Sequence, residues 1–218
     1  MKKLFFVIFS LSINVDAFAA FESTYEPLQS EKILFINGNI LDGEGNELLD
    51  TDLLIVDRKI IAIGKGISID DKDVKIIDAK DKWITPGIID IHSHMGVYSA
   101  PSVRTSSDGN EATSPVTAEV WAEHSMWVQD PQYALALKGG ITTFHVLPGS
   151  ANLIGGRGVT VKNLQRNTIQ SMKYPEAKHS LKMACGENPK RVYGSRGQAP
   201  STRMGNFAGY RKAWIEAE

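Results

Sequence analysis

The sequence predicts an α/β fold, and three consecutive patterns in its second half support this class. Residues 88–94 are rich in aliphatic residues and form a strand pattern. A helix is predicted over 133–138, and a second strand over 141–147. A strand, a helix and a strand in this order form a parallel pair joined by a crossover, which is the basic unit of α/β proteins.

Local signals define the ends of these elements. Asp130 and Pro131 offer an N-cap and a first-turn proline to the helix, and Gly139-Gly140 offers its C-terminal stop. Residues 181–185 form a third strand pattern, and another helix is predicted from Tyr210 to the last residue. The pattern of alternating strands and helices therefore continues toward the end of the chain.

A different pattern precedes the α/β part. Short β-branched and aliphatic runs alternate with turn residues, and they cover 33–36, 39–41, 53–56, 60–63 and 74–77. This pattern predicts a small antiparallel β domain over 32–85. So few short strands bury only a thin core, and we expect this domain to depend on packing against another part of the protein.

Composition excludes several classes of protein. The 218 residues include 24 Lys and Arg against 25 Asp and Glu, a net charge of -1, and 42% are hydrophobic. These values are typical of globular proteins and offer no clustered basic face for a nucleic acid. The single cysteine, Cys185, forms no intrachain disulfide and leaves too few thiolates for a cysteine-rich zinc module. Any metal site must use histidines and carboxylates.

The first twenty residues resemble a secretory signal peptide. Lys2-Lys3 precedes an apolar stretch over 4–13, and Ala17-Phe18-Ala19 has the small-x-small pattern of a cleavage site. Cleavage after Ala19 or Ala20 would export the protein to the periplasm or the medium, with a linker over 21–31. The alternative is an uncleaved anchor, but the apolar stretch is shorter than the roughly 20 residues that a membrane span needs. We therefore expect no stable span after cleavage.

The chemistry-bearing motif is Asp90-Ile91-His92-Ser93-His94. Side chains alternate along a strand, so Asp90, His92 and His94 share one face. Two imidazoles spaced in this way can converge on one metal ion. Asp90, two residues before His92 on the same face, can orient one of these ligands without binding the metal itself. Two histidines without a metal on an edge strand are the alternative.

Residues 85–94, Thr-Pro-Gly-Ile-Ile-Asp-Ile-His-Ser-His, resemble the P-G-x-x-D-x-H-x-H signature of the metal-dependent amidohydrolase superfamily. The earlier strands, with their Asn37-Gly38 and Asp42-Gly43 turns, resemble the N-terminal part of its composite β-sandwich. Gly139-Gly140-Ile141-Thr142-Thr143 resembles its second barrel strand. Residues 147–156 are similar to the imidazolonepropionase-related branch, and the resemblance covers about 32–218.

The resemblance implies a (β/α)8 barrel with a metal site at the C-terminal ends of its strands. His92 and His94 would bind one or two divalent ions, with zinc as the expected metal. The metal would activate water to attack a linear or cyclic amide or a dipeptide, and an aspartate would move the proton to the leaving nitrogen. That aspartate and the later ligands would lie beyond Glu218.

The chain is short for such a barrel. Residues 86–218 are about half of the roughly 250 residues that a (β/α)8 barrel takes, and three of its eight strands are predicted. The sequence therefore predicts the N-terminal portion of a barrel. We expect this portion to be inactive alone and, because its strand edges are unpaired, to aggregate or to stay partly unfolded.

Other residues have weaker motifs. Side-chain alternation along a strand places Glu187 on the same face as Met183 and Cys185. It would then be a third or bridging metal ligand, as in the related amino-sugar deacetylases. A solvated loop carboxylate is the alternative. His145 would contact substrate, or it is a structural group. The glycine-rich residues 149–158 predict a tight loop, and Cys185 is expected to be buried.

The leading interpretation is an exported hydrolase of carbon-nitrogen bonds with a small-molecule substrate and no nucleic-acid partner. An amino-sugar deacetylase of the same superfamily is one alternative. A non-catalytic scaffold that has lost its metal is the other, although the presence of His92 and His94 counts against it. A homo-oligomer is compatible with the sequence.

Overall fold

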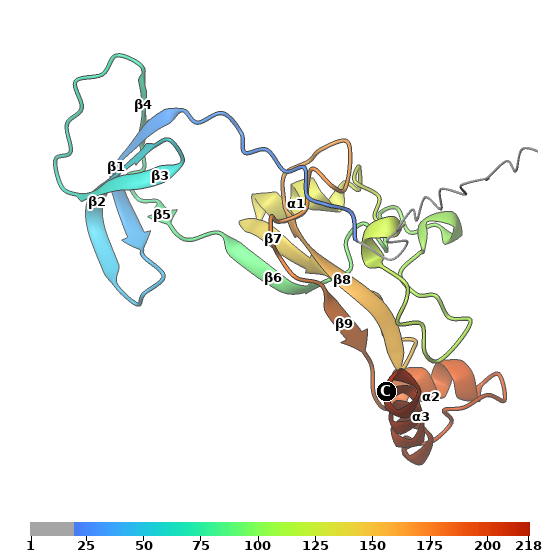
Figure 1. The fold of residues 1–218 in the computed structure, drawn as a ribbon. Coiled ribbons are helices and arrows are strands. Elements are labelled where there is room, and N and C mark those ends of the chain that lie inside the picture. The colour runs from blue at the N-terminus through green and yellow to red at the C-terminus, as the bar shows by residue number, and fades with distance from the viewer. Residues whose placement is uncertain (1–19) are drawn as a thin grey trace, which may run out of the picture.

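The computed structural model describes residues 20–218, whose strands form two separate sheets joined by short connecting segments (Figure 1). The predicted signal peptide lies almost entirely outside the described residues. Within residues 20–218, no helix combines the length and the apolar character that crossing a bilayer requires.

The first sheet has the order β3-β2-β1-β4, with β5 also pairing with β1. Its strands are β1 (Lys32–Leu41), β2 (Glu47–Val56), β3 (Lys59–Gly64), β4 (Val74–Asp78) and β5 (Trp83–Ile84). The first three strands are antiparallel, as predicted. However, β4 and β5 run parallel to β1, so the prediction of a wholly antiparallel domain is wrong. The chain crosses back after β3 and enters β4 in the direction of β1.

Turn chemistry explains the two hairpins of this sheet. Asp42 accepts hydrogen bonds from the main-chain N–H groups of Glu44 and Asn46, at 2.8 and 3.1 Å, which closes the β1–β2 turn. Asp57 and Arg58, between β2 and β3, both have positive φ, as the two-residue type I′ turn requires. The geometry of these two turns sets the register of the strands that they connect.

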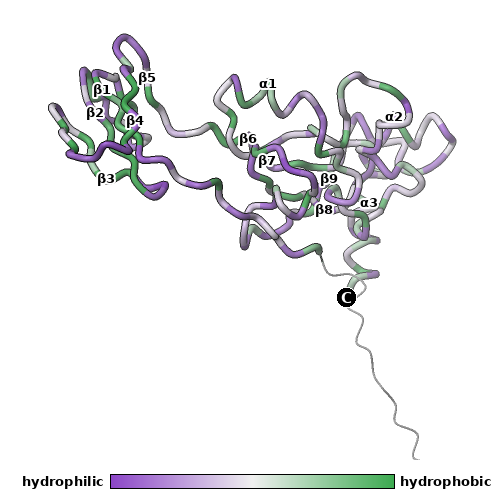
Figure 2. The backbone as a smooth tube through the Cα atoms, turned by 90° about the horizontal axis from the view of Figure 1, so that it is seen from above, coloured by the Kyte–Doolittle hydropathy of each residue, from purple (hydrophilic) through white to green (hydrophobic). Residues whose placement is uncertain are grey.

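The apolar side chains of the first sheet are unevenly buried. Leu34, Ile40, Leu53 and Leu54 are buried, whereas several large apolar side chains stay exposed, namely Ile60, Ile61, Ile76 and Trp83. Figure 2 shows the hydrophobic strands of this sheet ending in hydrophilic loops. That this sheet depends on packing against another part of the protein stays a prediction.

The second sheet has the order β6-β7-β8-β9. Its strands are β6 (Ile88–Ser93), β7 (Ile141–Val146), β8 (Ile154–Lys162) and β9 (Ser180–Met183). The helix α1 (Gln132–Lys138) connects β6 to β7, which are parallel, as the strand–helix–strand pattern predicted. β8 runs antiparallel to both β7 and β9, and its first five residues, 154–158, form the second half of the segment 149–158 that was predicted to be a loop.

The remaining elements flank the second sheet. The 3-10 turns η1 (Arg104–Ser106) and η2 (Ala122–His124) lie in the long connection after β6, and the helices α2 (Glu187–Gly194) and α3 (Arg203–Ala217) follow β9. α3 begins at Arg203 rather than at Tyr210, because Thr202 caps it by accepting the N–H of Gly205 at 3.0 Å. Cys185 is exposed, so the expectation of burial is wrong.

The main hydrophobic core lies in this second part of the molecule. Phe144, Val146, Val159 and Val161 of β7 and β8 are nearly inaccessible to solvent, and Tyr133 of α1 packs against them. This core fixes β7 and the end of β6, and it therefore fixes the position of the histidine motif.

Candidate metal centre

The two histidines of the motif lie together at the C-terminal end of β6. His92 is within the strand and His94 is one residue beyond it. Their rings are 5.2 Å apart between centroids and nearly perpendicular, at 83°. The Nδ1 atom of His94 lies 2.8 Å from the carbonyl oxygen of Leu147. Because this carbonyl can only accept a hydrogen bond, Nδ1 carries the proton and the lone pair is left on Nε2. His94 is therefore prepared to bind a metal through Nε2.

His92 faces a positively charged group. Its Nε2 atom lies 3.2 Å from the Nζ atom of Lys182 on β9, which is only 8% exposed. Lys182, then burial and then His94 lower the pKa of His92, while Asp90 opposes them. Burial also lowers the pKa of Lys182. The neighbouring ammonium thus disfavours protonation of His92, and a neutral imidazole is the form that binds a metal, but the metal would have to replace Lys182 at Nε2.

Asp90 supports the histidines through the backbone. Its Oδ1 atom accepts the main-chain N–H of His92 at 3.1 Å. The side chain therefore fixes the strand end that carries His92, rather than the imidazole ring itself. This contact differs from the bond to a ligand ring that the sequence suggested.

His145 of β7 uses both ring nitrogens within the protein. Nδ1 lies 2.9 Å from the hydroxyl oxygen of Thr160, and Nε2 lies 2.6 Å from that of Ser180. Burial, followed by the nearby His179 and His92, lowers the pKa of His145. A substrate would contact this ring only by replacing one of these two hydroxyl partners.

Glu187 does not share a strand face with the histidines. β9 ends at Met183, and Glu187 is the exposed first residue of α2, so the parity argument for its position is wrong. Among residues 20–218, no group of three or more His, Cys, Asp or Glu side chains is arranged to hold a metal ion. The described residues therefore contribute two ligands that suit a divalent metal, and not a complete centre.

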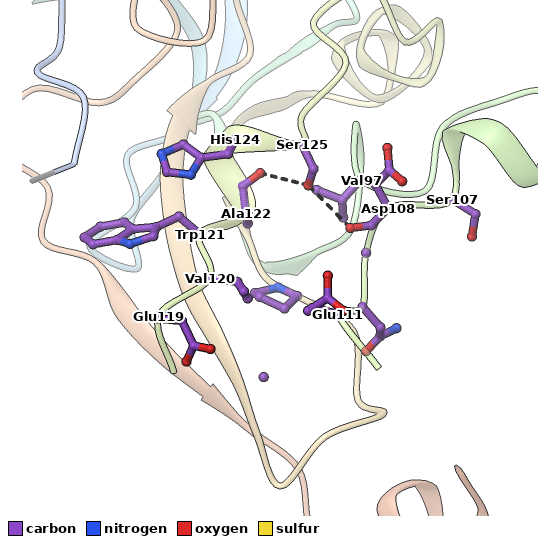
Figure 3. Close-up of a pocket in the computed structure, with 14 residues that line it drawn as sticks. Val97, Ser107, Asp108, Glu111, Glu119, Val120, Trp121, Ala122, His124 and Ser125 are labelled. Atoms are coloured by element: carbon purple, nitrogen blue, oxygen red, sulfur yellow. Dashed lines mark hydrogen bonds between the residues drawn. The ribbon is translucent and has the colours of Figure 1, made fainter. Parts of the chain in front are cut away.

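A separate pocket of about 480 Å³ lies beside the long loop after β6 (Figure 3). Trp121, His124 and Ser125 line one part of it, and three carboxylates also border it, from Asp108, Glu111 and Glu119. Ser125 donates to the carbonyl oxygens of Ala122 and Asp108, which holds the wall together. Neither His92 nor His94 lines this pocket, so it is distinct from the proposed ligand pair.

Sequence reasoning missed Lys182. The alternation Leu181-Lys182-Met183 contains a usable signal, since it places the lysine on the face opposite two apolar residues. In the structure the two apolar side chains are partly exposed, and the lysine is buried against His92. No local pattern shows that this face of β9 reaches β6.

Comparisons with known proteins place this geometry in context. The amidohydrolase tasK of Hapsidospora irregularis is 37% identical over 155 residues, covering 67% of this chain and 16% of that protein. A dihydroorotase of Bacillus cytotoxicus is 33% identical over 117 residues, covering 54% and 21%. The crystal structure of an amidohydrolase from Thermotoga maritima MSB8 has a TM-score of 0.76 and 39% identity, and it covers 85% of this chain. The chain is similar to amidohydrolases in both sequence and fold.

No protein-family model matches the chain. The chain spans 47% of the Thermotoga maritima protein and a smaller share of the two curated relatives. These similarities agree with the superfamily resemblance that the sequence motifs suggested. The names of these relatives do not specify the imidazolonepropionase-related branch.

Proposed function

We propose that this chain belongs to a metal-dependent hydrolase of carbon-nitrogen bonds and carries the first two ligands of its metal centre. The observation that carries the proposal is the His92–His94 pair at the end of β6, where the carbonyl oxygen of Leu147 lies 2.8 Å from Nδ1 of His94 and leaves Nε2 of that ring for a metal. The amidohydrolase and dihydroorotase names of its relatives support the same reaction class. The substrate would be a small linear or cyclic amide or a dipeptide, and the motif over 147–156 favours the imidazolonepropionase-related branch.

A divalent ion, with zinc as the expected metal, would be held by His92 and His94, and it would activate water and polarise the scissile carbonyl. The protein's own groups prepare this pair. The carbonyl of Leu147 fixes the ring tautomer of His94, and Asp90 fixes the backbone of His92. Lys182 disfavours protonation of His92. Each of these contacts favours the metal-binding form of an imidazole before any ion arrives.

We further propose that the remaining ligands and the proton-transferring aspartate come from sequence outside residues 20–218. Among the described residues, no third His, Cys, Asp or Glu side chain is arranged with the pair to hold a metal ion, which supports this. Zinc sites take three or four protein ligands, so two histidines alone would bind weakly and would not turn over substrate. Export to the periplasm or the medium, as the N-terminal motif suggests, is part of the same proposal.

Zinc binding to the purified chain tests the ligand assignment. Calorimetric titration with Zn²⁺ should detect one weak site, and His92→Ala or His94→Ala should weaken it about tenfold or more. His124→Ala is the matched control, because this histidine is half exposed and lies in η2, and it should leave the affinity unchanged. Equal affinities for the native chain and His92→Ala would refute the proposed centre.

Glu187→Gln tests the remaining candidate ligand. Because Glu187 is exposed at the start of α2, we expect this change to leave zinc affinity unchanged. A loss comparable to that of His92→Ala would instead place Glu187 in the centre. It would also favour the amino-sugar deacetylase alternative.

A further inference from the structure

The described chain begins with a segment that is held against the second part of the molecule by several hydrogen bonds. Figure 1 shows this blue segment running from the second part of the molecule to β1. Ser23 donates to the carbonyl oxygen of Lys173 at 2.9 Å, and the N–H of Thr24 donates to that of Gln170 at 3.0 Å. The ring of Phe21 packs against that of His124, with 4.9 Å between centroids.

Two buried charges bind the main chain of Phe21. Its N–H donates to Oε1 of Glu123 at 3.0 Å, and its carbonyl oxygen accepts a hydrogen bond from Nζ of Lys173. The same Nζ lies 2.6 Å from Oε2 of Glu123. The side chain of Glu123 is completely buried, and that of Lys173 is 7% exposed. We call this arrangement the Glu123–Lys173 clamp.

Such a clamp is costly to build. Burying a carboxylate and an ammonium removes both from water, and their mutual attraction repays this only if further hydrogen bonds satisfy them. In this protein the further bonds come from the backbone of Phe21. The residues that precede Phe21 in the sequence are Ala19 and Ala20, where the signal-peptide pattern places its cleavage.

We propose that the Glu123–Lys173 clamp is a binding site for the new N-terminus of this chain, created by cleavage after Ala19. The inference uses the predicted signal peptide and is independent of the proposed hydrolase function. Cleavage releases an α-ammonium on Ala20, about 3.6 Å or less along the chain from the N–H that Glu123 binds. The carboxylate then lies beside a full positive charge, and charged hydrogen bonds are roughly twice as strong as neutral ones.

The surroundings suit this role. The other titratable group against Oε1 is His124, whose Nε2 lies 3.9 Å away and whose side chain is half exposed. A groove beside Phe21 is lined by Met126, Val128 and Ile169 and also by Glu123 of the clamp. Glu22 is exposed, so Glu22→Gln removes one negative charge from the segment without changing the clamp and serves as the control for Glu123→Gln.

The first test is the intact mass of the protein exported by a bacterial host. We expect a chain that begins at Ala20. A chain that begins at Phe21 also supports the clamp, because its ammonium would then sit on Oε1 itself. Retention of residues 1–19, or a start beyond Phe21, would overturn the proposal.

The second test measures how well the terminus is protected in the folded chain. An aminopeptidase should release Ala20 about tenfold more slowly from the native chain than from a peptide of residues 20–30, as expected when release requires breaking charged bonds. Glu123→Gln should remove most of this protection, and Glu22→Gln should retain it. Insertion of Gly-Gly between Ala20 and Phe21 keeps both clamp side chains but moves the ammonium away, and it should also accelerate release. Equal release rates for the native chain, Glu123→Gln and the insertion would refute the proposal.

Discussion

Asp130 is the residue whose replacement should most clearly disturb the loop that follows the histidine motif. It is 1% exposed and accepts four hydrogen bonds. Oδ2 accepts from the N–H of Gly96 at 3.0 Å and from Nε2 of Gln132 at 2.9 Å. Oδ1 accepts from the N–H groups of Gln132 and Ala100, at 3.0 and 3.3 Å. One carboxylate thus binds the first N–H of α1 and holds the chain two residues after His94.

Asp130→Asn keeps the shape but places an NH₂ group against N–H donors. At least two bonds are lost, and two buried donors are left without partners. Each such loss costs about 1–3 kcal/mol, so we expect the free energy of unfolding to fall by about 4 kcal/mol. Urea unfolding followed by tryptophan fluorescence measures this change. Gln129→Ala, at the exposed neighbouring position, should cost less than about 0.5 kcal/mol. A loss below about 1 kcal/mol for Asp130→Asn would show that the four contacts do not act together.

Three further predictions concern other positions. Burial lowers the pKa of His145 below its ordinary 6.5, so on acidification the unfolded chain takes up a proton at this histidine before the folded chain does. The free energy of unfolding should therefore fall as the pH drops through about 6.5. His145→Gln should flatten this dependence in urea titrations between pH 7.5 and 5, and an unchanged slope would contradict the assignment. Gly156 and Gly45 both have positive φ, but a Cβ at Gly156 would lie 2.5 Å from the carbonyl oxygen of Val120, whereas at Gly45 it would meet nothing. Gly156→Ala should therefore lower the unfolding free energy by about 2 kcal/mol more than Gly45→Ala, and similar values would refute the steric argument. Burial raises the pKa of Tyr210 to about 12, so the difference between the absorbance titrations of the native chain and Tyr210→Phe should show one tyrosine transition near pH 12; a difference curve with its midpoint near pH 10 would disagree.

Local sequence patterns were sufficient for several parts of the second sheet. Aliphatic runs and capping residues correctly predicted β6, β7 and α1, because these signals act within a few residues. The two-residue spacing also correctly predicted that His92 and His94 lie close together. Whether they bind a metal stays a prediction.

β8 shows why the rest could not be predicted. Its glycines favoured a loop, since glycine is usually depleted in strands. In the structure, a Cβ at Gly158 would lie 2.7 Å from the hydroxyl of Ser180, so glycine is required there by the close approach of another strand. That neighbour lies more than 20 residues away, and its approach leaves no trace in the local pattern.

Partners that are distant in sequence explain the other differences. The parallel pairing of β4 with β1 depends on the path of the crossover between them, which the strand patterns do not specify. Likewise, Lys182 meets His92 across 90 residues, so only the assembled sheet shows the contact. The predicted position of Glu187 was wrong because it assumed that the strand continues to residue 187, whereas β9 ends at Met183.

The route of residues 20–31 has a mechanical consequence for the first sheet. The strands of the two sheets do not pair, and the linker from β5 to β6 is short. A body on one such linker could swivel freely. Here the segment that is bound at Phe21 leads into the start of β1. The first sheet is therefore connected to the rest of the molecule by two segments, one before β1 and one after β5 (Figure 1). Two connections let the sheet rock about the line that joins the attachment points but prevent a full rotation. Cleavage of either connecting segment would restore that rotation.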